Sequence, residues 1–158
     1  MSEGQGLKVK DGEKDWVFVS DAHINGREPE ETDAFIGFLD QEKERLSHLV
    51  ILGDLFEFFF GFGGSCPEGN PPSKKRSLQA QYLPVLGKLQ ELERLGVRIV
   101  YFEGNHDFFL APFFRGPLGM DVEVYRDGGE IRLGGRRTFL AHETCPIRVS
   151  GSIVCFAG

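Results

Sequence analysis

The sequence predicts an α/β fold built around a parallel sheet. Three short apolar runs, at residues 16–20, 48–52 and 97–102, have the length and the aliphatic or aromatic content of buried strands. Segments with a helical spacing of apolar residues separate these runs, and such alternation is typical of right-handed βαβ units. Each run is also followed closely by acidic, amide or glycine residues, which places polar side chains just beyond the expected strand ends.

The first helix is expected over residues 30–47. Pro29 precedes this segment, and acidic residues in the first turn complement the helix dipole. A partial apolar stripe with helical spacing is made by Phe35, Phe38, Leu39 and Leu46.

The second helix is expected over residues 78–95, where apolar residues again recur at helical spacing. Pro84 and Gly87 interrupt this pattern, and Gly96 stands where a helix commonly stops. Before this helix, residues 61–73 are rich in Gly, Pro and Ser and are expected to form a loop.

From residue 122 onward the pattern changes to short strands, expected at residues 122–125, 130–133 and 137–140. The dipeptide Gly134-Gly135 is typical of a two-residue hairpin connection. We expect these strands to begin a second sheet. The polar residues 1–15 are expected to be a disordered lead-in, so the predicted domain spans residues 16–143.

Length and charge limit the classes of function. The chain has 158 residues, which is the size of one domain. Its net charge of -6 argues against a general nucleic-acid binder, because such proteins present basic faces to phosphate. A small phosphorylated substrate remains compatible with this charge, since bound cations reverse the local sign.

Cysteine usage and hydropathy bear on location. The odd number of cysteines, with no C-x-x-C pair, favours a reduced cytoplasmic setting over a disulfide framework; they are Cys66, Cys145 and Cys155. Residues 1–15 lack the apolar core of a secretory signal, and no run approaches the roughly 18 apolar residues of a spanning helix. We therefore expect a soluble protein or one that sits on a membrane surface.

Four short segments carry metal-ligand residue types, each just past a β-rich run. They are Asp21-Ala22-His23, Gly53-Asp54-Leu55-Phe56-Glu57, Gly104-Asn105-His106-Asp107 and Ala141-His142. Any one alone is an ordinary turn or a structural histidine. Because ligands of open α/β sheets bind beyond the carboxyl ends of the strands, the four together predict one cluster. Carboxylate, imidazole and amide donors suit Mn, Fe or Zn rather than soft thiolate chemistry.

These motifs resemble those of the calcineurin-like metallophosphoesterases. Within that superfamily, the aromatic residues after Glu57 and the run from Gly104 to Phe108 are similar to the UDP-2,3-diacylglucosamine pyrophosphatases of lipid A synthesis. The resemblance covers about residues 16–143. It implies a four-layer αββα sandwich, here truncated, and hydrolysis of UDP-2,3-diacylglucosamine to 2,3-diacylglucosamine 1-phosphate and UMP at the inner face of the cytoplasmic membrane.

The resemblance also implies residue roles. Asp21 and His23 would hold one metal ion, Asn105 and His142 a second, and Asp54 would bridge the pair, with Mn as the expected metal and Fe or Zn as alternatives. Two such ions activate the attacking water and clamp the reacting oxygens. His106 would contact the phosphate or protonate the leaving group, and Glu57 would orient that histidine. The substrate would be contacted by Asn105, His106 and Phe58.

The chain departs from this family at two places. The lipid A pyrophosphatases usually carry Arg at the position of His106. Relatives also follow the strand-end histidine with Gly-Asp and later carry Gly-His-x-His, whereas here Glu143 follows His142 and no later histidine is present. Residues 144–158 therefore form an atypical tail, for which we consider a frameshift, or alternatively a real strand around residues 152–156.

Further alternatives stay open. The Phe runs at residues 58–60, 108–109 and 113–114 are core residues by default, or else an apolar wall for acyl chains. Lys74-Lys75-Arg76 is a solvated segment or a contact for anionic headgroups. The function is alternatively hydrolysis of another small phosphoester, or metal binding by a catalytically dead remnant.

Overall fold

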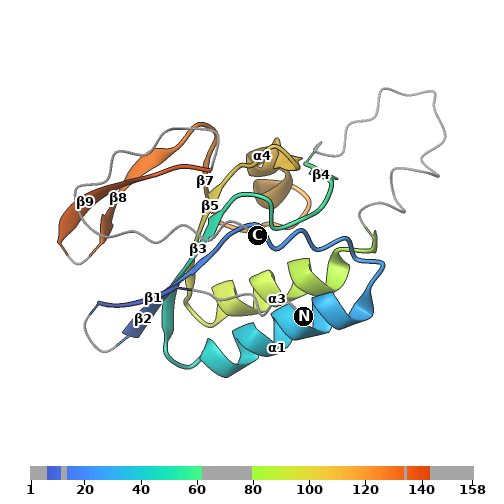
Figure 1. The fold of residues 1–158 in the computed structure, drawn as a ribbon, viewed down its shortest axis with the longest axis horizontal. Coiled ribbons are helices and arrows are strands. Elements are labelled where there is room, and N and C mark those ends of the chain that lie inside the picture. Colours follow the sequence, from blue (N-terminus) through green and yellow to red (C-terminus); the bar gives the residue numbers. More distant parts are fainter. Residues whose placement is uncertain (1–6, 12–13, 62–79, 134, 143–158) are drawn as a thin grey trace.

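A parallel sheet forms the centre of the structure, a computed structural model that describes residues 7–11, 14–61, 80–133 and 135–142. Within these residues the sheet has five strands in the order β1-β2-β3-β5-β7 (Figure 1). Their bounds are Leu7–Asp11, Lys14–Val19, Leu46–Leu52, Arg98–Phe102 and Glu123–Tyr125. β1 is antiparallel to β2, and the other neighbours are parallel. The α/β fold with a parallel sheet is confirmed.

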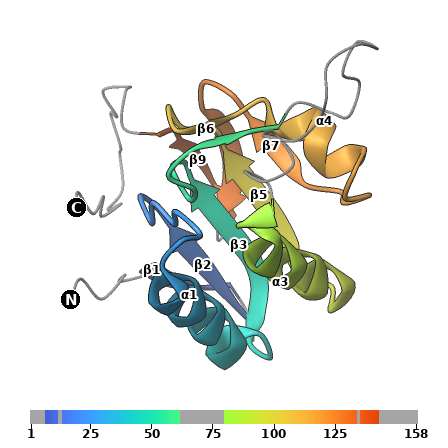
Figure 2. The same cartoon turned by 90° about the vertical axis from the view of Figure 1, so that its right-hand side faces the viewer.

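Helices α1 (Pro29–Glu42) and α3 (Leu83–Arg94) lie side by side against one face of the sheet (Figures 1 and 2). The apolar core beneath them is continuous and includes Val17, Leu39, Leu49, Leu89 and Ile99. Burying the apolar sides of these two helices provides the main driving force for this layer.

A hairpin of β8 (Gly129–Leu133) and β9 (Arg136–Leu140) packs against the opposite face of the sheet. Ile131 and Leu140 join a second buried cluster with Phe18, Val50 and Val100. The antiparallel pairing predicted across Gly134-Gly135 is confirmed, although Gly134 itself lies outside the described residues.

The first predicted helix ends earlier than expected. The helix was expected to run to residue 47, but α1 ends at Glu42 and β3 already begins at Leu46. Leu46 is buried as a strand residue, and the N–H of Asp15 donates to the carbonyl of Arg45 at 2.7 Å. Pairing with β2 therefore overrides the helical periodicity at this end.

The second helix was expected to start at residue 78; Ala80 is helical, and a turn at residues 81 and 82 separates it from the long helix that follows. α3 starts at Leu83, and Pro84 lies in its first turn, where the missing N–H carries no penalty. Gly96 has a φ of 86°, in the left-handed region that favours glycine, so the predicted stop is confirmed. Residues 78 and 79 lie outside the described part of the chain.

The expected disordered lead-in is wrong for residues 7–11 and 14–15, which belong to β1 and β2. Leu7 and Val9 alternate with Lys8 and Lys10, a period typical of strands, and this signal was overlooked within a polar segment. β1 pairs along its length with β2, so its backbone hydrogen bonds explain the order of this segment.

The first of the short strands does not begin a second sheet. β7 instead extends the central sheet, parallel to β5, and Tyr125 stacks on Phe102 with ring centroids 4.9 Å apart. The connection contains α4 (Leu110–Arg115), a helix that the sequence analysis missed. Its adjacent buried residues Phe113 and Phe114 hide the helical period.

Several expectations fall on residues that the structure does not describe. They concern the loop up to residue 73, the basic segment Lys74-Lys75-Arg76, the three cysteines and the tail at 144–158. Among the described helices, none combines the length and apolar character that crossing a bilayer requires.

An ion-pair cluster links α1 to α3. Lys88, largely buried on α3, places its Nζ 2.8 Å from Asp40 Oδ1 on α1 and 2.6 Å from Glu91 Oε2. Hydrogen bonds from Lys88 lower the pKa of both Asp40 and Glu91 below their ordinary values. Because these pKa values are lower in the folded state, the pairs stabilise the fold above the ordinary carboxylate pKa.

We predict that Lys88→Met lowers the urea midpoint at neutral pH, because it removes the ammonium group that pairs with the carboxylates of Asp40 and Glu91. This difference from the wild type should shrink as the pH falls below the ordinary pKa values of 3.8 for Asp40 and 4.5 for Glu91, where both acids take up protons. Urea unfolding at several pH values measures it, with the exposed Lys14→Met as control. A pH-independent difference would contradict the electrostatic explanation.

Candidate metal centre

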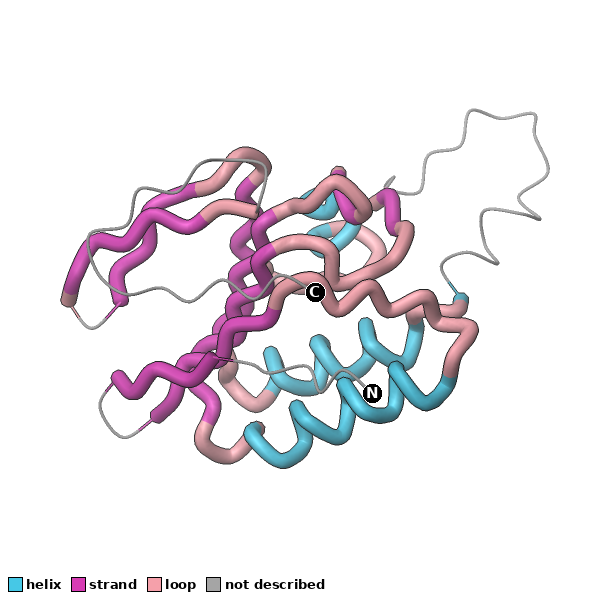
Figure 3. Tube along the Cα trace, in the orientation of Figure 1, coloured by secondary structure: helices cyan, strands magenta, loops and turns pink. Residues whose placement is uncertain are grey.

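The predicted cluster is present at one end of the sheet. The loops that follow β2, β3 and β5 lie side by side there (Figure 3). They carry Asp21 and His23, Asp54, and Asn105 and His106, while His142 approaches from the end of β9. The rule that ligands gather beyond the carboxyl ends of parallel strands therefore placed these side chains correctly.

The β2 and β3 chains remain hydrogen-bonded after both strands end. The N–H groups of Asp21 and His23 donate to the carbonyls of Gly53 (3.2 Å) and Asp54 (3.0 Å). The N–H of Ile24 then donates to Leu55 at 2.9 Å. This continued pairing fixes the register of the two loops, so the side chains face one another from a defined backbone.

Three of the clustered residues have a left-handed backbone. The φ angles of Asp21, His23 and Asp54 are 51°, 46° and 50°. Residues other than glycine rarely adopt this conformation, which costs roughly 1–2 kcal/mol for each residue. Strain of this kind concentrates at functional sites, and here it falls on acidic and imidazole side chains that the surrounding hydrogen bonds hold in place.

Two glycines permit the close approach of the segments. A Cβ on Gly104 would collide with the carboxylate of Asp54, and a Cβ on Gly53 would collide with the ring of His142. Gly53 and Gly104 belong to two of the motifs that predicted the site. Any larger residue at these positions would collide with a side chain of the site, which explains why glycine stands there.

His142 brings three potential metal-ligand atoms together. Its Nδ1–H donates to the carbonyl oxygen of Leu52 at 2.9 Å. Its Nε2 lies 3.2 Å from Asp54 Oδ2 and 3.1 Å from Asn105 Oδ1. A carboxylate oxygen, an amide oxygen and an imidazole nitrogen thus lie close together, and all three are ligand types that divalent cations accept.

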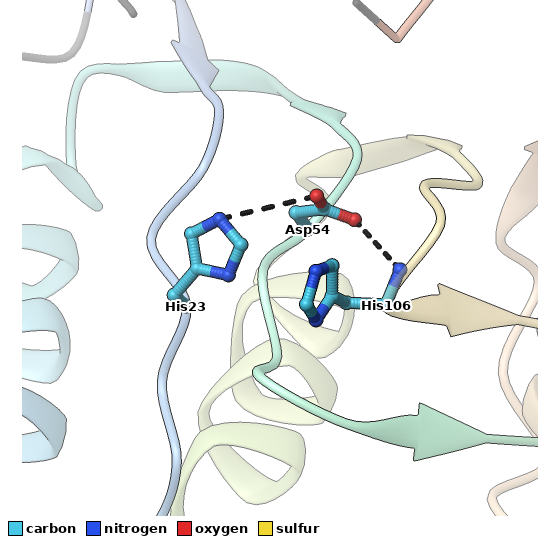
Figure 4. A group of neighbouring side chains, drawn as sticks. All are labelled: His23, Asp54 and His106. Atoms are coloured by element: carbon cyan, nitrogen blue, oxygen red, sulfur yellow. Dashed lines mark hydrogen bonds and ion pairs between the residues drawn. The ribbon is translucent and has the colours of Figure 1, made fainter. Parts of the chain in front are cut away.

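His23 approaches the same carboxylate oxygen of Asp54 as His142 does. Its Nε2 lies 3.9 Å from Asp54 Oδ2 and 3.9 Å from Asp21 Oδ1 (Figure 4). Ligand atoms within 4.8 Å of one another define two groups that could hold a metal ion, namely His23, Asp54 and His106, and Asp21, Asp54 and His142. Asp54, which is 3% exposed, is common to both groups.

Glu57 takes a different partner from the one expected. Its Oε2 lies 3.1 Å from Nδ1 of His23, while Nδ1–H of His106 donates to the main-chain carbonyl of Glu57 at 2.7 Å. The hydrogen bond to this carbonyl raises the pKa of His106, and nearby acids add to the effect against the opposing effect of burial. The prediction that the Glu57 carboxylate orients His106 is therefore wrong. The main-chain carbonyl of Glu57 contacts His106 instead.

Asp107 is the residue that the sequence analysis quoted without a role. Its fully buried carboxylate accepts N–H groups of Asp54 (3.0 Å), Leu55 (2.8 Å), Phe56 (3.3 Å) and Gly104 (3.0 Å). The hydroxyl of Tyr101 also donates to it. No residue spacing reveals this contact, because four of its five donors belong to the backbone.

Burial raises the pKa of Asp107, and the hydrogen bonds from Tyr101 and the backbone oppose that rise. Burial also raises the pKa of Tyr101 well above its usual range, helped by the adjacent Asp107 charge. Tyr101 therefore keeps its proton and remains a donor at neutral pH.

The phenylalanine runs divide between two environments. Phe59, Phe113 and Phe114 are buried in the core. Phe58 is 53% exposed beside Glu57, and its ring lies 4.5 Å from Phe60. The core reading is therefore confirmed for Phe59, Phe113 and Phe114, and the apolar wall for acyl chains stays a prediction.

Comparison with known proteins gives the family relationship. No protein-family model matches the chain. It is 32% identical over 126 residues to a UDP-2,3-diacylglucosamine hydrolase of Aliivibrio fischeri, and 32% identical over 128 residues to one of Tolumonas auensis. A Vibrio cholerae protein of the same name is 27% identical over 126 residues. The chain is similar in sequence to these hydrolases over part of their length.

The similarity to the UDP-2,3-diacylglucosamine hydrolases covers 80% of this chain and 45–46% of each of these three relatives. The chain therefore spans about half the length of the curated relatives that it matches. The resemblance predicted from the motifs is confirmed.

We predict that Asp107→Asn destabilises the fold by about 2–3 kcal/mol, because an amide N–H₂ would face backbone donors and leave buried groups unpaired. The measurement is urea unfolding at neutral pH. Asp33→Asn, on an exposed position of α1, makes the same chemical change as control. Equal stability of the two variants would show that the Asp107 contacts contribute nothing net.

Proposed function

We propose that this end of the sheet binds two divalent cations, with Mn²⁺ as the expected ion and Fe or Zn as alternatives. Asp21 and His23 would hold one ion, Asn105 and His142 the other, and Asp54 both. The main support is the set of potential ligand atoms that lie close together at Asp54, Asn105 and His142. Neutral imidazole, amide oxygen and carboxylate are ligands that such ions accept.

We further propose hydrolysis of a phosphodiester or pyrophosphate bond at this site. Divalent cations bound there would polarise the phosphoryl oxygens toward attack by water. His106, whose pKa is raised by its hydrogen bond to the Glu57 carbonyl, would donate a hydrogen bond or a proton to the phosphate or the leaving group. Asn105 would also contact the phosphate.

The names of the relatives support a substrate. UDP-2,3-diacylglucosamine would be cleaved between its two phosphorus atoms into 2,3-diacylglucosamine 1-phosphate and UMP. The exposed ring of Phe58 beside Glu57 would contact this lipid-linked nucleotide. Such a substrate implies a cytoplasmic protein with peripheral contact at the inner face of the membrane.

We also propose that the fold is part of an αββα sandwich. The hairpin of β8 and β9 lies on the face of the sheet opposite α1 and α3, as the second sheet of an αββα sandwich would. A second candidate function is metal binding without turnover.

We predict that the chain binds two equivalents of Mn²⁺ in a calorimetric titration. Asp54→Asn should weaken both binding events, because Asp54 belongs to both groups, whereas His142→Gln should weaken one. Asp33→Asn serves again as the control for charge. Two full-affinity sites in Asp54→Asn would contradict the bridging role, and absence of binding in the wild type would remove the proposed metal centre.

We predict Mn²⁺-dependent release of UMP from UDP-2,3-diacylglucosamine, measured by chromatography. His106→Asn should lower turnover by about 10²–10⁴-fold, the usual contribution of a positioned acid or base. A simple phosphodiester assayed in parallel tests the alternative substrate class. Mn²⁺ binding without turnover of either substrate would favour the second candidate function.

A further inference from the structure

We infer that Glu57 positions both histidines that face Asp54, His23 through its carboxylate and His106 through its main-chain carbonyl. The inference rests on the proposed metal centre, since it concerns how an imidazole ligand is presented there. Figure 4 shows the rings of His23 and His106 next to each other, both near the Asp54 carboxylate. Their centroids lie 5.0 Å apart with an interplanar angle of 88°.

The carboxylate of Glu57 selects one tautomer of His23. Oε2 lies 3.1 Å from Nδ1, so a proton on Nδ1 makes a charge-assisted hydrogen bond. Nε2 is then left with its lone pair, directed toward the carboxylates of Asp21 and Asp54, each 3.9 Å away. A carboxylate behind the ring that leaves the other nitrogen free is the usual support of a metal-binding histidine.

The backbone holds Glu57 at this position. Its N–H donates to the carbonyl of Ile24 at 3.0 Å, and Ile24 and Phe56 form an isolated parallel bridge. His23 is thus one residue from a backbone contact that also includes Glu57. The side chains of His23 and Glu57 are 38% and 50% exposed, where an ion pair alone contributes little. Prior placement by the backbone reduces the conformational entropy that the contact would otherwise cost.

The second histidine depends on a different atom of the same residue. Nδ1–H of His106 donates to the carbonyl of Glu57, and a substitution of the Glu57 side chain leaves that carbonyl in place. His106 is therefore an internal control in any variant at position 57. A general disturbance of the loop would alter both rings, whereas loss of the carboxylate should alter only His23.

The test is ¹⁵N NMR of the imidazole nitrogens in the metal-free chain at about pH 8.5, above the ordinary imidazole pKa. In the wild type we expect the proton on Nδ1 of both His23 and His106. In Glu57→Ala, His23 should shift toward the Nε2–H tautomer that a free histidine side chain favours, while His106 should not change. Glu57→Gln keeps an acceptor oxygen and should retain much of the wild-type tautomer.

A Mn²⁺ titration of the same variants gives the second measurement. Glu57→Ala should weaken one Mn²⁺ binding event by about 10–100-fold, the usual effect of removing a residue that supports a ligand. Glu57→Gln should lie between this variant and the wild type. The exposed Glu44→Ala removes an equal charge elsewhere and should match the wild type in both measurements.

The outcomes separate this inference from the proposed function. An unchanged His23 tautomer in Glu57→Ala, a change in both histidines, or a wild-type Mn²⁺ affinity in that variant overturns the inference. If the wild type itself binds no Mn²⁺, the proposed metal centre fails, and the tautomers of His23 and His106 still decide whether Glu57 positions the rings.

Discussion

The buried carboxylate of Asp107 is the contact on which the arrangement of this site depends. It collects N–H groups from Asp54, Leu55 and Phe56 and from Gly104, and so ties the loop after β3 to the loop after β5. The two carboxylate oxygens of Asp107 accept hydrogen bonds from four main-chain N–H groups and from the Tyr101 hydroxyl. Because these donors are buried, each of them would lower the stability of the fold if it had no acceptor. The same contact holds Asp54 in its left-handed conformation, which the residue would not keep in isolation.

Around that contact, potential ligand atoms are concentrated where the cations are proposed to bind. Nε2 of His142 lies 3.2 Å from Oδ2 of Asp54 and 3.1 Å from the amide oxygen of Asn105. The fold stabilises the arrangement from behind, through the Leu52 carbonyl on His142 and the backbone pairing of the β2 and β3 loops. A site held in this way is already organised before its ligand arrives, so little further ordering would be required on binding.

The sequence could predict where the site lies because one topological rule, that of parallel strand ends, converts four distant motifs into neighbours. It could not predict which atoms meet. The role of Asp107 depends on backbone donors, which leave no trace in residue type, and the partner of Glu57 depends on the register of two loops past their strands. In the fold, Leu46 satisfied a helical period and a strand equally well, and only pairing with β2 decided between them. β7 was misplaced for a related reason, because short strands look alike whichever sheet they join.

The spacing between Asp54 and Glu57 acquires a physical meaning from these contacts. Asp54 turns through a left-handed conformation, Phe56 returns to pair with Ile24, and Glu57 consequently arrives beside His23 with its carbonyl toward His106. A residue inserted or removed between the acids would break the Ile24 contact and displace both atoms at once. With Glu57 three residues after Asp54, the same loop presents the Asp54 carboxylate and places Glu57 in contact with both His23 and His106. The contact with His106 is made by the main-chain oxygen of Glu57. Substituting the Glu57 side chain would therefore remove only its contact with His23 and leave the contact with His106 in place.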